Sequence, residues 1–429
     1  MSHQSSTEST RMDEQKLGPL DRAGAVTIEI KRNQPLSDGI LNLIWHEQVI
    51  SRADIARQTG LAKSTVSENI SFLLKSGLVQ ESGIGVSGGG RQPILLSFQD
   101  EACCVLGVEI GARHVAVTLT DLRGKVLVWS ERSFPARTDP DGTRRLVLEL
   151  CADCVRNRPS ARTQLVGIGV AVPSPVNPES PQRLSEIVMP AWQGRLGLEQ
   201  LTREYDVPLF VDNDANLGAL AEFWWGAGRG NRDFIYIKSA TGIGAGYILD
   251  GRIYKGGSGF AGEIGHLSID PEGLDCICGL KGCLVTRVGL DAVLARAREL
   301  LAHHPDSTLN GSEVSVDALA AAAHNGDRLA RQVIEETADS FSVAIAGLLN
   351  ALNPRAVIIG GSLASLGVLL LEPLGQAIRN RMNISTNQLT EIKVSELGTR
   401  SVAIGAATQV IKEALANPRL FPTLNKAEA

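Results

Sequence analysis

Residues 262–283 read GEIGHLSIDPEGLDCICGLKGC, a short loop broken by glycines. It brings together His266, Cys276, Cys278 and Cys283, and three of the chain's seven cysteines fall here within eight residues. Thiolate sulfur and imidazole nitrogen are the donors that hold zinc in proteins, and four of them complete a closed tetrahedral site. The alternative is that the thiols are buried as small apolar side chains. The spacing favours a structural Zn²⁺ site that fixes the fold of this segment.

The composition of the remaining chain is that of an ordinary globular protein. It has 429 residues, 43% of them hydrophobic and 21% charged, which predicts two or three domains. A net charge of −5 argues against general coating of nucleic acid but allows one small DNA-binding module. No apolar run approaches the ~20 residues that cross a bilayer, and the polar N-terminus does not resemble a signal peptide. We therefore expect a cytoplasmic protein with no membrane partner.

The four cysteines outside the loop show no disulfide spacing, which fits a reducing compartment. They are Cys103, Cys104, Cys151 and Cys154. The last two could form a redox pair or half of a second metal site. Their segment has a helical pattern and no partner cluster, so packing is the favoured interpretation.

The N-terminal region predicts a winged helix-turn-helix over residues 35–99, after a flexible tail at residues 1–34. From Leu36 the pattern changes, and the apolar residues between 41 and 45 suggest a first helix. Ser51 can cap a second helix, and a third starts at about Lys63 with apolar residues at helical spacing. Two short strands flank the glycine-rich stretch 83–93, which predicts a β-hairpin wing.

The third helix offers polar side chains to the base edges of a major groove. The predicted DNA contacts are Arg52, Lys63, Ser64, Thr65, Ser67, Asn69 and, on the wing, Arg91. The alternative is a small helical bundle for protein interaction, but the polar helix face and the Gly-Arg wing favour DNA. Residues 31–97 contain seven Lys or Arg against five Asp or Glu. So small a surplus favours a homodimer or dimer of dimers on double-stranded operator DNA.

From Cys103 the pattern becomes α/β and occurs twice. The first half predicts strands at 105–110, 115–119, 126–128 and 166–172 with a helix around 142–157; the second predicts strands at 234–237, 244–249 and 356–361 with a helix around 327–352. Two comparable halves predict a duplicated α/β fold with a central cleft, where ligands usually bind.

In order along the chain, several motifs resemble those of the ROK family, which contains repressors, open reading frames and sugar kinases of the actin-like ATPase superfamily. They are the wing GVSGGGRQPILL, VDNDANLGALAE (211–222), ATGIGAG (240–246), GEIGH (262–266) and the cysteine cluster. The resemblance covers about residues 38–415. It implies a sugar-binding domain at 100–415 with two lobes (about 100–212 plus a C-terminal helix, and about 213–390), and leaves 416–429 as a tail.

The resemblance also implies functional residues. His266 and the three cysteines would bind zinc, and Asn213, Asp214, Glu263 and His266 would line a sugar pocket. Carboxylate and amide groups suit sugar hydroxyls, and Asp214 would stand at the general-base position. The alternative for residues 212–214 is a capped turn after a strand; Glu263 in its motif favours the pocket.

Two departures separate this chain from the kinases of the family. Those kinases carry an Asp-x-Gly-Gly-Thr loop for ATP phosphates, whereas this chain reads Glu109-Ile-Gly-Ala112-Arg113. Ala112 adds a Cβ where a phosphate must approach closely. Val285 stands where the kinases usually have a sugar-binding Glu. The second glycine loop, 241–246, is intact, although its glycines could serve strand packing alone. We expect no catalytic residue here, with Asp214 a vestige of the general base.

The leading hypothesis is thus a sugar-responsive transcriptional repressor of carbohydrate-metabolism genes. A small sugar or sugar derivative in the cleft would alter operator affinity. One alternative is an ATP-dependent sugar kinase with an added DNA-binding domain. A third is regulation by a docking phosphotransfer protein. The identity of the sugar, and whether it induces or co-represses, stay open.

Overall fold

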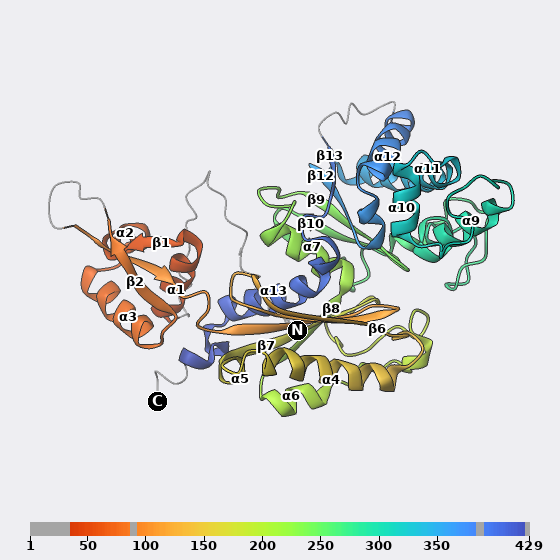
Figure 1. Ribbon diagram of the computed structural model, residues 1–429. Helices are drawn as coiled ribbons and strands as arrows, with labels where there is room; N and C mark the ends of the chain where they lie inside the picture. The colour runs from red at the N-terminus through yellow and green to blue at the C-terminus, as the bar shows by residue number, and fades with distance from the viewer. Residues whose placement is uncertain (1–34, 86–91, 383–389, 425–429) are drawn as a thin grey trace, which may run out of the picture.

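The computed structural model describes residues 35–85, 92–382 and 390–424, and it contains a small head and two α/β lobes (Figure 1). The predicted tail at residues 1–34 lies outside the described residues. Below, the head comprises α1 to β3, the first lobe β4 to β8, and the second lobe β9 to β13.

The head has the predicted winged-helix form. Its elements are α1 (Leu36–Glu47), β1 (Val49–Ser51), α2 (Arg52–Thr59), α3 (Lys63–Lys75), β2 (Val79–Ile84) and β3 (Ile94–Phe98). Ser51 caps α2 as expected, because its side chain accepts a hydrogen bond from the Asp54 amide. The sequence did not predict β1, whose three residues pair with β3 to complete a sheet of order β1-β3-β2.

The first lobe is a five-stranded sheet covered by helices. Its elements are β4 (Cys104–Ile110), β5 (His114–Thr120), β6 (Val126–Ser133), α4 (Pro140–Arg156), α5 (Ala161–Gln164), β7 (Leu165–Val172), η1 (Pro190–Trp192), α6 (Glu199–Tyr205) and β8 (Leu209–Asn213). Strands β4 and β7 are buried along their whole length, as expected of strands covered on both faces.

The second lobe repeats this plan and adds more helices. Its elements are β9 (Phe234–Ser239), β10 (Ile243–Leu249), β11 (Arg252–Tyr254), η2 (Ile264–His266), α8 (Val285–Val288), α9 (Leu290–Leu301), α10 (Val316–His324), α11 (Arg328–Leu352), β12 (Ala356–Gly360), η3 (Ser362–Leu366), α12 (Val368–Arg381), β13 (Glu391–Val394) and η4 (Gly398–Arg400). The strand orders, β6-β5-β4-β7-β8 and β11-β10-β9-β12-β13, match position for position. In each sheet the first three strands in the chain pair antiparallel and the last two join in parallel. The predicted duplication is confirmed.

Two helices lie between the sheets, α7 (Asp214–Trp225) and α13 (Ser401–Ala416) (Figure 1). They cross so closely that a Cβ on Gly405 of α13 would stand 1.8 Å from the carbonyl oxygen of Leu217 in α7. Glycine is therefore required at this crossing. The close contact packs α7 and α13 into one layer, which contacts the sheets of both lobes.

The head is packed against this layer. One hydrophobic cluster runs from α1 and α3 of the head into α7 and α13. Asn42 of α1 also donates a hydrogen bond to the carbonyl oxygen of Leu415 at 2.9 Å. The head is therefore held by buried contacts rather than only by a linker.

The C-terminal segment differs from its prediction as a tail. The short helix η5 (Pro418–Leu420) follows α13, and Phe421 is fully buried. Its ring lies 6.4 Å from the ring of Phe98 in β3. Phe421 and Leu424 of this segment belong to the hydrophobic core between head and body. Among the described helices, none is long and apolar enough to cross a membrane.

Candidate effector and metal site

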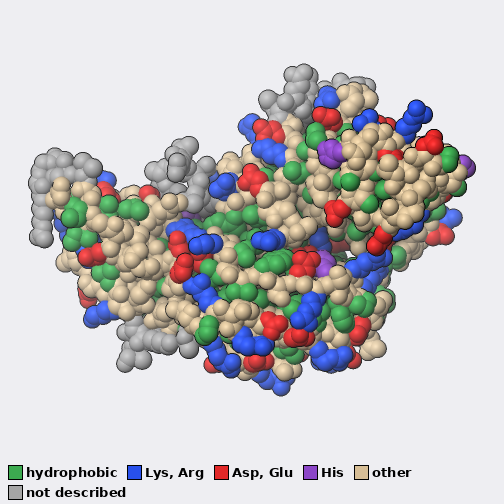
Figure 2. Space-filling view, viewed as in Figure 1, with side chains coloured by type: hydrophobic (Ala, Val, Ile, Leu, Met, Phe, Trp, Pro, Cys, Tyr) green, Lys and Arg blue, Asp and Glu red, His purple; other side chains and the backbone are tan. Residues whose placement is uncertain are grey.

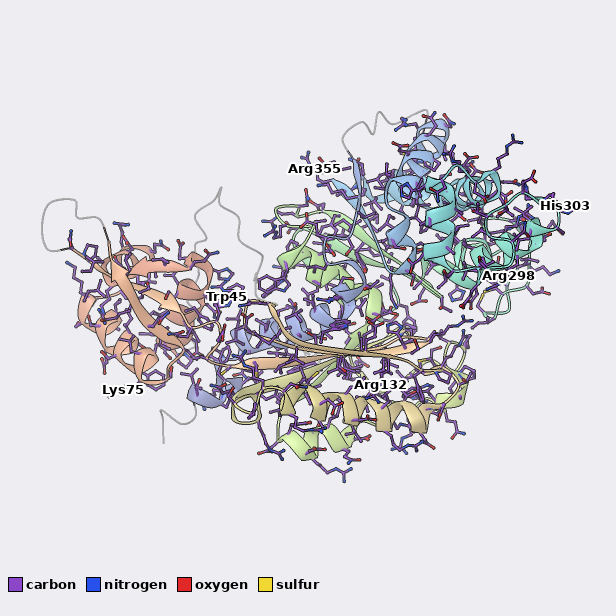
Figure 3. The ribbon with its side chains drawn as sticks, in the orientation of Figure 1. Trp45, Lys75, Arg132, Arg298, His303 and Arg355 are labelled. Atoms are coloured by element: carbon purple, nitrogen blue, oxygen red, sulfur yellow. The ribbon has the colours of Figure 1, made fainter. Side chains whose placement is uncertain are left out.

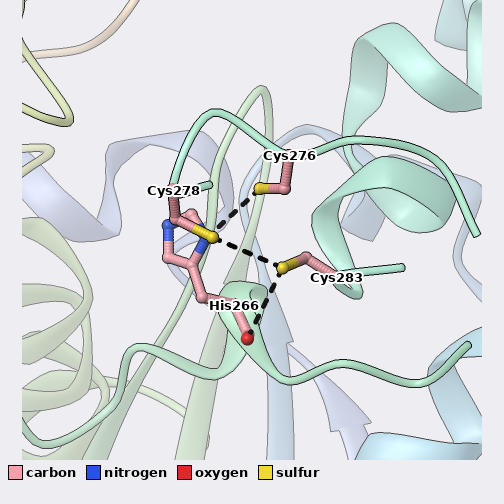
Figure 4. A group of neighbouring side chains, drawn as sticks. All are labelled: His266, Cys276, Cys278 and Cys283. Atoms are coloured by element: carbon pink, nitrogen blue, oxygen red, sulfur yellow. Dashed lines mark hydrogen bonds between the residues drawn. The ribbon is translucent and has the colours of Figure 1, made fainter. Parts of the chain in front are cut away.

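Four metal-binding side chains meet in the loop between η2 and α8. The ligand atoms of His266, Cys276, Cys278 and Cys283 all lie within 4.8 Å of one another (Figure 4). Cys276 Sγ is 3.5 Å from His266 Nδ1, and Cys278 Sγ is 3.6 Å from Cys283 Sγ. A tetrahedral metal with bonds of about 2.0–2.3 Å separates its ligands by about 3.5–3.8 Å. The cluster can therefore hold a metal ion, and its separations fit a tetrahedral site.

The glycines of this loop have a clear role at one position. Gly282 has φ 61°, and a Cβ there would stand 1.5 Å from the carbonyl oxygen of Asp270. Only glycine fits so close a backbone crossing. The crossing brings Cys283 back against residue 268, to which it forms a β-bridge.

The two cysteines of the predicted helical segment have a structural role. Cys151 and Cys154 of α4 are free and buried. Burial raises the pKa of the Cys154 thiol to about 12, so it stays protonated and unreactive at neutral pH. Packing, the favoured interpretation, fits these observations.

The end of β8 and the start of α7 carry the predicted pocket residues Asn213 and Asp214. Asn213 caps α7: its Oδ1 accepts hydrogen bonds from the amides of Ala215 and Asn216, and its Nδ2 donates to the carbonyl oxygen of Ser174. The capped turn weighed from the sequence is therefore real. It leaves one N–H of Asn213 to donate to a ligand. Asp214 is buried, with 6% of its surface exposed.

Asp214 belongs to a buried charge network that the sequence did not reveal. Lys238 at the end of β9 places its Nζ 2.5 Å from Asp214 Oδ2 and 3.7 Å from Glu109 Oε1. His114 Nε2 lies 3.4 Å from the same oxygen of Glu109. Burial raises the pKa of Asp214, and the ammonium of Lys238 opposes that shift. A lysine in an otherwise buried strand was the one signal of this network in the sequence.

Glu263 adds a second carboxylate on the side of the second lobe. It is half-buried just before η2. Burial and the charge of Asp214 raise the pKa of Glu263 to about 7. This electrostatic coupling means that the structure brings Asp214 and Glu263 into one neighbourhood. Tyr247 belongs to it as well, because burial and the Glu263 charge raise the pKa of Tyr247 to about 12.

In the turn between β4 and β5, the His114 side chain folds back over Gly111. A Cβ on Gly111 would lie 2.3 Å from Cε1 of His114, so the imidazole covers this glycine directly. The neighbouring Arg113 pairs with Asp291 of α9 at 2.9 Å. The Gly111 amide itself donates a hydrogen bond to the backbone carbonyl oxygen of His114 at 2.9 Å.

The second glycine loop is explained in part by packing. A Cβ on Gly246 would stand 2.4 Å from the carbonyl oxygen of Ala215 in α7, and one on Gly244 would stand 3.2 Å from the Ala215 methyl. Both glycines thus let β10 approach α7. Val285, at the position of the missing glutamate, begins α8 and packs against the core of the second lobe.

Besides Lys238 with Glu109, two further ion pairs join the lobes. One is Arg113 with Asp291; the other is Lys255, after β11, with Asp212, whose Oδ2 lies 2.6 Å away. Figure 2 shows acidic and basic side chains along the line where the lobes meet. We call this region, with Asp214, Glu263, Lys238 and Glu109, the lobe junction.

On the head, the predicted DNA face is largely open to solvent. Lys63, Ser64 and Ser67 of α3 are exposed, whereas Thr65 and Asn69 are half-buried, and Asn69 donates to the Thr65 carbonyl oxygen. Two further residues complete the predicted set. Arg52 pairs with Glu81 of the wing strand at 3.1 Å, and Arg91 lies outside the described residues.

The fold and site define a DNA-binding head on a duplicated sugar-kinase-like body. A family model described as ROK family matches residues 105–413, and one described as winged helix-turn-helix DNA-binding matches residues 39–80. The chain belongs to the ROK family. It has the repressor architecture, with the winged head before the ROK region.

Its relatives include named repressors that match nearly the whole chain. The xylose repressor of Caldicellulosiruptor bescii is 32% identical over 383 residues, which cover 88% of this chain and 96% of that protein. The DNA-binding transcriptional dual regulator NagC of Escherichia coli is 32% identical over 391 residues, covering 90% of this chain and 95% of that one.

Solved structures show both the repressor and the kinase side of the family. A ROK family transcriptional regulator, a homologue of the E. coli MLC protein, has a TM-score of 0.76 at 27% identity and covers 92% of this chain and 98% of its own. A ROK family glucokinase from Streptomyces griseus, in complex with glucose and AMPPNP, has a TM-score of 0.64 at 25% identity. It covers 71% of this chain and 98% of its own.

Proposed function

We propose that a small sugar binds at the lobe junction and changes the affinity of the head for operator DNA. The protein is a sugar-responsive DNA-binding transcriptional repressor. One observation carries the proposal: helix α7 begins at Asp214 in the lobe junction and ends at Trp225 against the head. One helix therefore contacts both the effector residues and the DNA-binding module.

The chemistry of the lobe junction suits a polyhydroxylated ligand. Asp214 and Glu263 offer carboxylate acceptors for hydroxyl groups, and Asn213 keeps one N–H to donate. His266 directs Nδ1 toward Cys276, so a metal bound there would fix the tautomer and leave Nε2 for the ligand. Buried polar groups of this kind discriminate strongly among sugars because each unmatched group is costly.

We assign zinc to the His/Cys₃ cluster, in a structural role. A closed donor set of three thiolates and one imidazole has no open position for chemistry. Its place in the loop after Glu263 supports a brace that holds Glu263 and His266 at the lobe junction.

At the other end of α7, an aromatic contact attaches the head. The Trp45 ring of α1 lies 5.4 Å from that of Trp224 and 6.4 Å from that of Trp225, where head and body meet (Figure 3). The guanidinium of Arg123 stacks over Trp45 at 4.2 Å and donates to its carbonyl oxygen at 2.7 Å. We call these four side chains the head joint.

The head joint is well packed but incompletely hydrogen-bonded. Among the described residues, the indole nitrogens of Trp45 and Trp224 and one nitrogen of Arg123 find no acceptor. A buried donor without a partner costs about 1–3 kcal/mol. The head joint is therefore held mainly by ring packing and by the contacts of Arg123.

The coupling itself must come from a difference in affinity. A sugar that binds one arrangement of the lobes about 100-fold more tightly than the other shifts the balance by about 2.7 kcal/mol. Movement of the lobes about Asp214 would displace α7, and through Trp224 the head. In a homodimer on a palindromic operator, that displacement alters the spacing of the two α3 helices.

The side-chain contacts at the β4–β5 turn support a binding protein over a sugar kinase. Phosphoryl transfer needs backbone amides and a metal ion around the ATP phosphates. Here His114 covers Gly111 and Arg113 is paired with Asp291. ATP turnover with a sugar in a coupled assay, abolished by Asp214→Asn, would overturn this preference.

The experiment that tests the function begins with a thermal-shift panel of monosaccharides and their derivatives, since a ligand at 100 times its Kd adds about 2.7 kcal/mol of stability. The sugar that stabilises the protein is then titrated against the operator-bound repressor. We expect operator affinity to change by at least about tenfold. An unchanged affinity would refute sugar control.

A further inference from the structure

Lys238 is the only charged residue of strand β9, and its side chain is turned into the lobe junction. The strand is buried along its whole length, and Lys238 is 8% exposed. Its ammonium lies 2.5 Å from Asp214 and 3.7 Å from Glu109, carboxylates that come from two different strand ends of the first lobe. A buried ammonium costs several kcal/mol unless carboxylates surround it, so this placement is specific.

The positive charges in this group can cancel its two carboxylates, as a divalent metal ion would. Glu109 and Asp214 supply two negative charges, and Lys238 supplies one positive charge. His114, beside Glu109, supplies a second when protonated. Although burial opposes the shift, the Glu109 carboxylate raises the pKa of His114. The lysine and the imidazolium together carry the charge of one divalent cation.

Two facing carboxylates without Lys238 would be a divalent-cation site. Mg²⁺ and Mn²⁺ prefer carboxylate oxygen ligands, and phosphoryl transfer from ATP depends on such an ion. The Lys238 ammonium lies within 4 Å of both carboxylates, so its positive charge opposes the binding of a metal ion to either of them.

We propose that the Lys238 ammonium is a built-in cation that replaces a nucleotide-bound metal ion between Glu109 and Asp214, and that it restricts the lobe junction to ligands without a metal-nucleotide partner. Lys238 is thus a specificity-determining and positioning residue. It also orients Asp214 Oδ2, leaving Oδ1 to accept a ligand hydroxyl. This role rests on the proposed effector site but is measured without the sugar.

The second carboxylate oxygen of Glu109 also suits a role as an acceptor for a ligand hydroxyl. Glu109 Oε2 is buried and has no hydrogen-bond partner among the described residues. An unpaired buried carboxylate oxygen is costly, and a hydroxyl donor would satisfy it. The ion-paired carboxylates therefore act as fixed acceptors rather than as metal ligands.

The test is Mn²⁺ binding to the full-length, zinc-saturated protein, followed by electron paramagnetic resonance at pH 8. Three proteins are compared: the wild type, Lys238→Met, and the double variant Lys238→Met with Glu109→Gln. We expect no Mn²⁺ site at the lobe junction in the wild type. Lys238→Met, which removes the ammonium beside both carboxylates, should bind Mn²⁺ at least about tenfold more tightly than the wild type. The double variant, with one carboxylate, should lose this tighter binding.

The result that overturns the proposal is a wild type that binds Mn²⁺ as tightly as Lys238→Met, or a Lys238→Met protein that folds and gains no site. If Lys238→Met does not fold, the wild type decides: a Mn²⁺ site that Glu109→Gln removes overturns the proposal, and the absence of that site supports it. Neither outcome depends on operator release, so failure here is distinguishable from failure of sugar control.

Discussion

The two ends of helix α7 differ in chemistry. The N-terminal end at Asp214 lies among ionisable groups, Lys238, Glu109 and Glu263, whose interactions a polar ligand can change. The C-terminal end at Trp224 and Trp225 packs against the buried Trp45 ring of the head. The polar end can therefore respond to a bound ligand, whereas the aromatic end attaches the head. The difference teaches that the effector residues and the DNA-binding head contact opposite ends of one helix.

Removal of the metal cluster should have the largest effect on this comparison. Cys276→Ser deletes one of four ligands, and the loop that carries Glu263 and His266 should loosen. We expect loss of bound zinc, of the sugar response and of much of the DNA binding. Cys154→Ser, at a buried thiol in α4, is the control and should keep all three. Elemental analysis and operator binding measure the outcome; normal regulation by a zinc-free variant would remove the structural role.

Asp214→Asn breaks the polar end directly. The variant leaves the Lys238 ammonium with only Glu109, and breaking a buried pair typically costs about 3–5 kcal/mol. Sugar affinity should fall by about 100-fold, because charged hydrogen bonds to the ligand are lost. Chemical denaturation and isothermal titration with the sugar found in the thermal-shift panel measure both. Sugar affinity within a factor of two of the wild type would exclude Asp214 from the pocket.

Trp45→Leu breaks the aromatic end. The cavity should cost about 2–4 kcal/mol in the free energy of unfolding. Sugar should still bind with wild-type affinity but no longer change operator affinity. Trp192→Leu is a matched control, because Trp192 is also 2% exposed and also stacks on an arginine, Arg144, but lies in the first lobe. Equal uncoupling by both variants would show that general softening, not the head joint, is responsible.

The head joint should also weaken as the pH falls. Burial and the charge of Arg123 lower the pKa of His46 from 6.5 to about 4. The unfolded state therefore gains a proton before the folded state does, so the contribution of neutral His46 is complete above pH 6.5 and is lost towards pH 4. The loss by pH 5.5 is about 1 kcal/mol. Denaturation of His46→Gln should show that much less dependence between pH 7 and pH 5.5; an unchanged dependence would contradict the assignment.

The smallest effect is expected on the DNA face. Lys63→Ala should weaken operator binding by about tenfold or less and lower the salt slope by about 1, because one phosphate contact is lost. Lys75→Ala is the control, since Lys75 is equally exposed at the opposite end of α3 (Figure 3). Fluorescence anisotropy at several salt concentrations compares them. Equal salt slopes for the two variants would show that the N-terminal end of α3 is not the DNA-contacting end.

The sequence predicted features that depend on local patterns. The third helix starting at Lys63, the repeated strand pattern and the His266 and cysteine cluster all follow from spacing within one segment. It did not predict contacts between distant segments. Lys238 pairs with residues 24 and 129 positions away, and Phe421 joins the core only because β3 lies beside it. Packing of a lysine or a terminal phenylalanine is decided by the tertiary structure, which periodicity does not encode.

The central claim is that α7 carries the sugar signal from Asp214 to the head. The most direct measurement is operator affinity as a function of sugar concentration in the wild type and in Trp45→Leu, with sugar binding followed in the same samples. We expect the sugar to change wild-type operator affinity by at least about tenfold, and to bind Trp45→Leu equally well without changing its operator affinity. A Trp45→Leu protein whose operator affinity still responds to sugar as in the wild type would contradict the account.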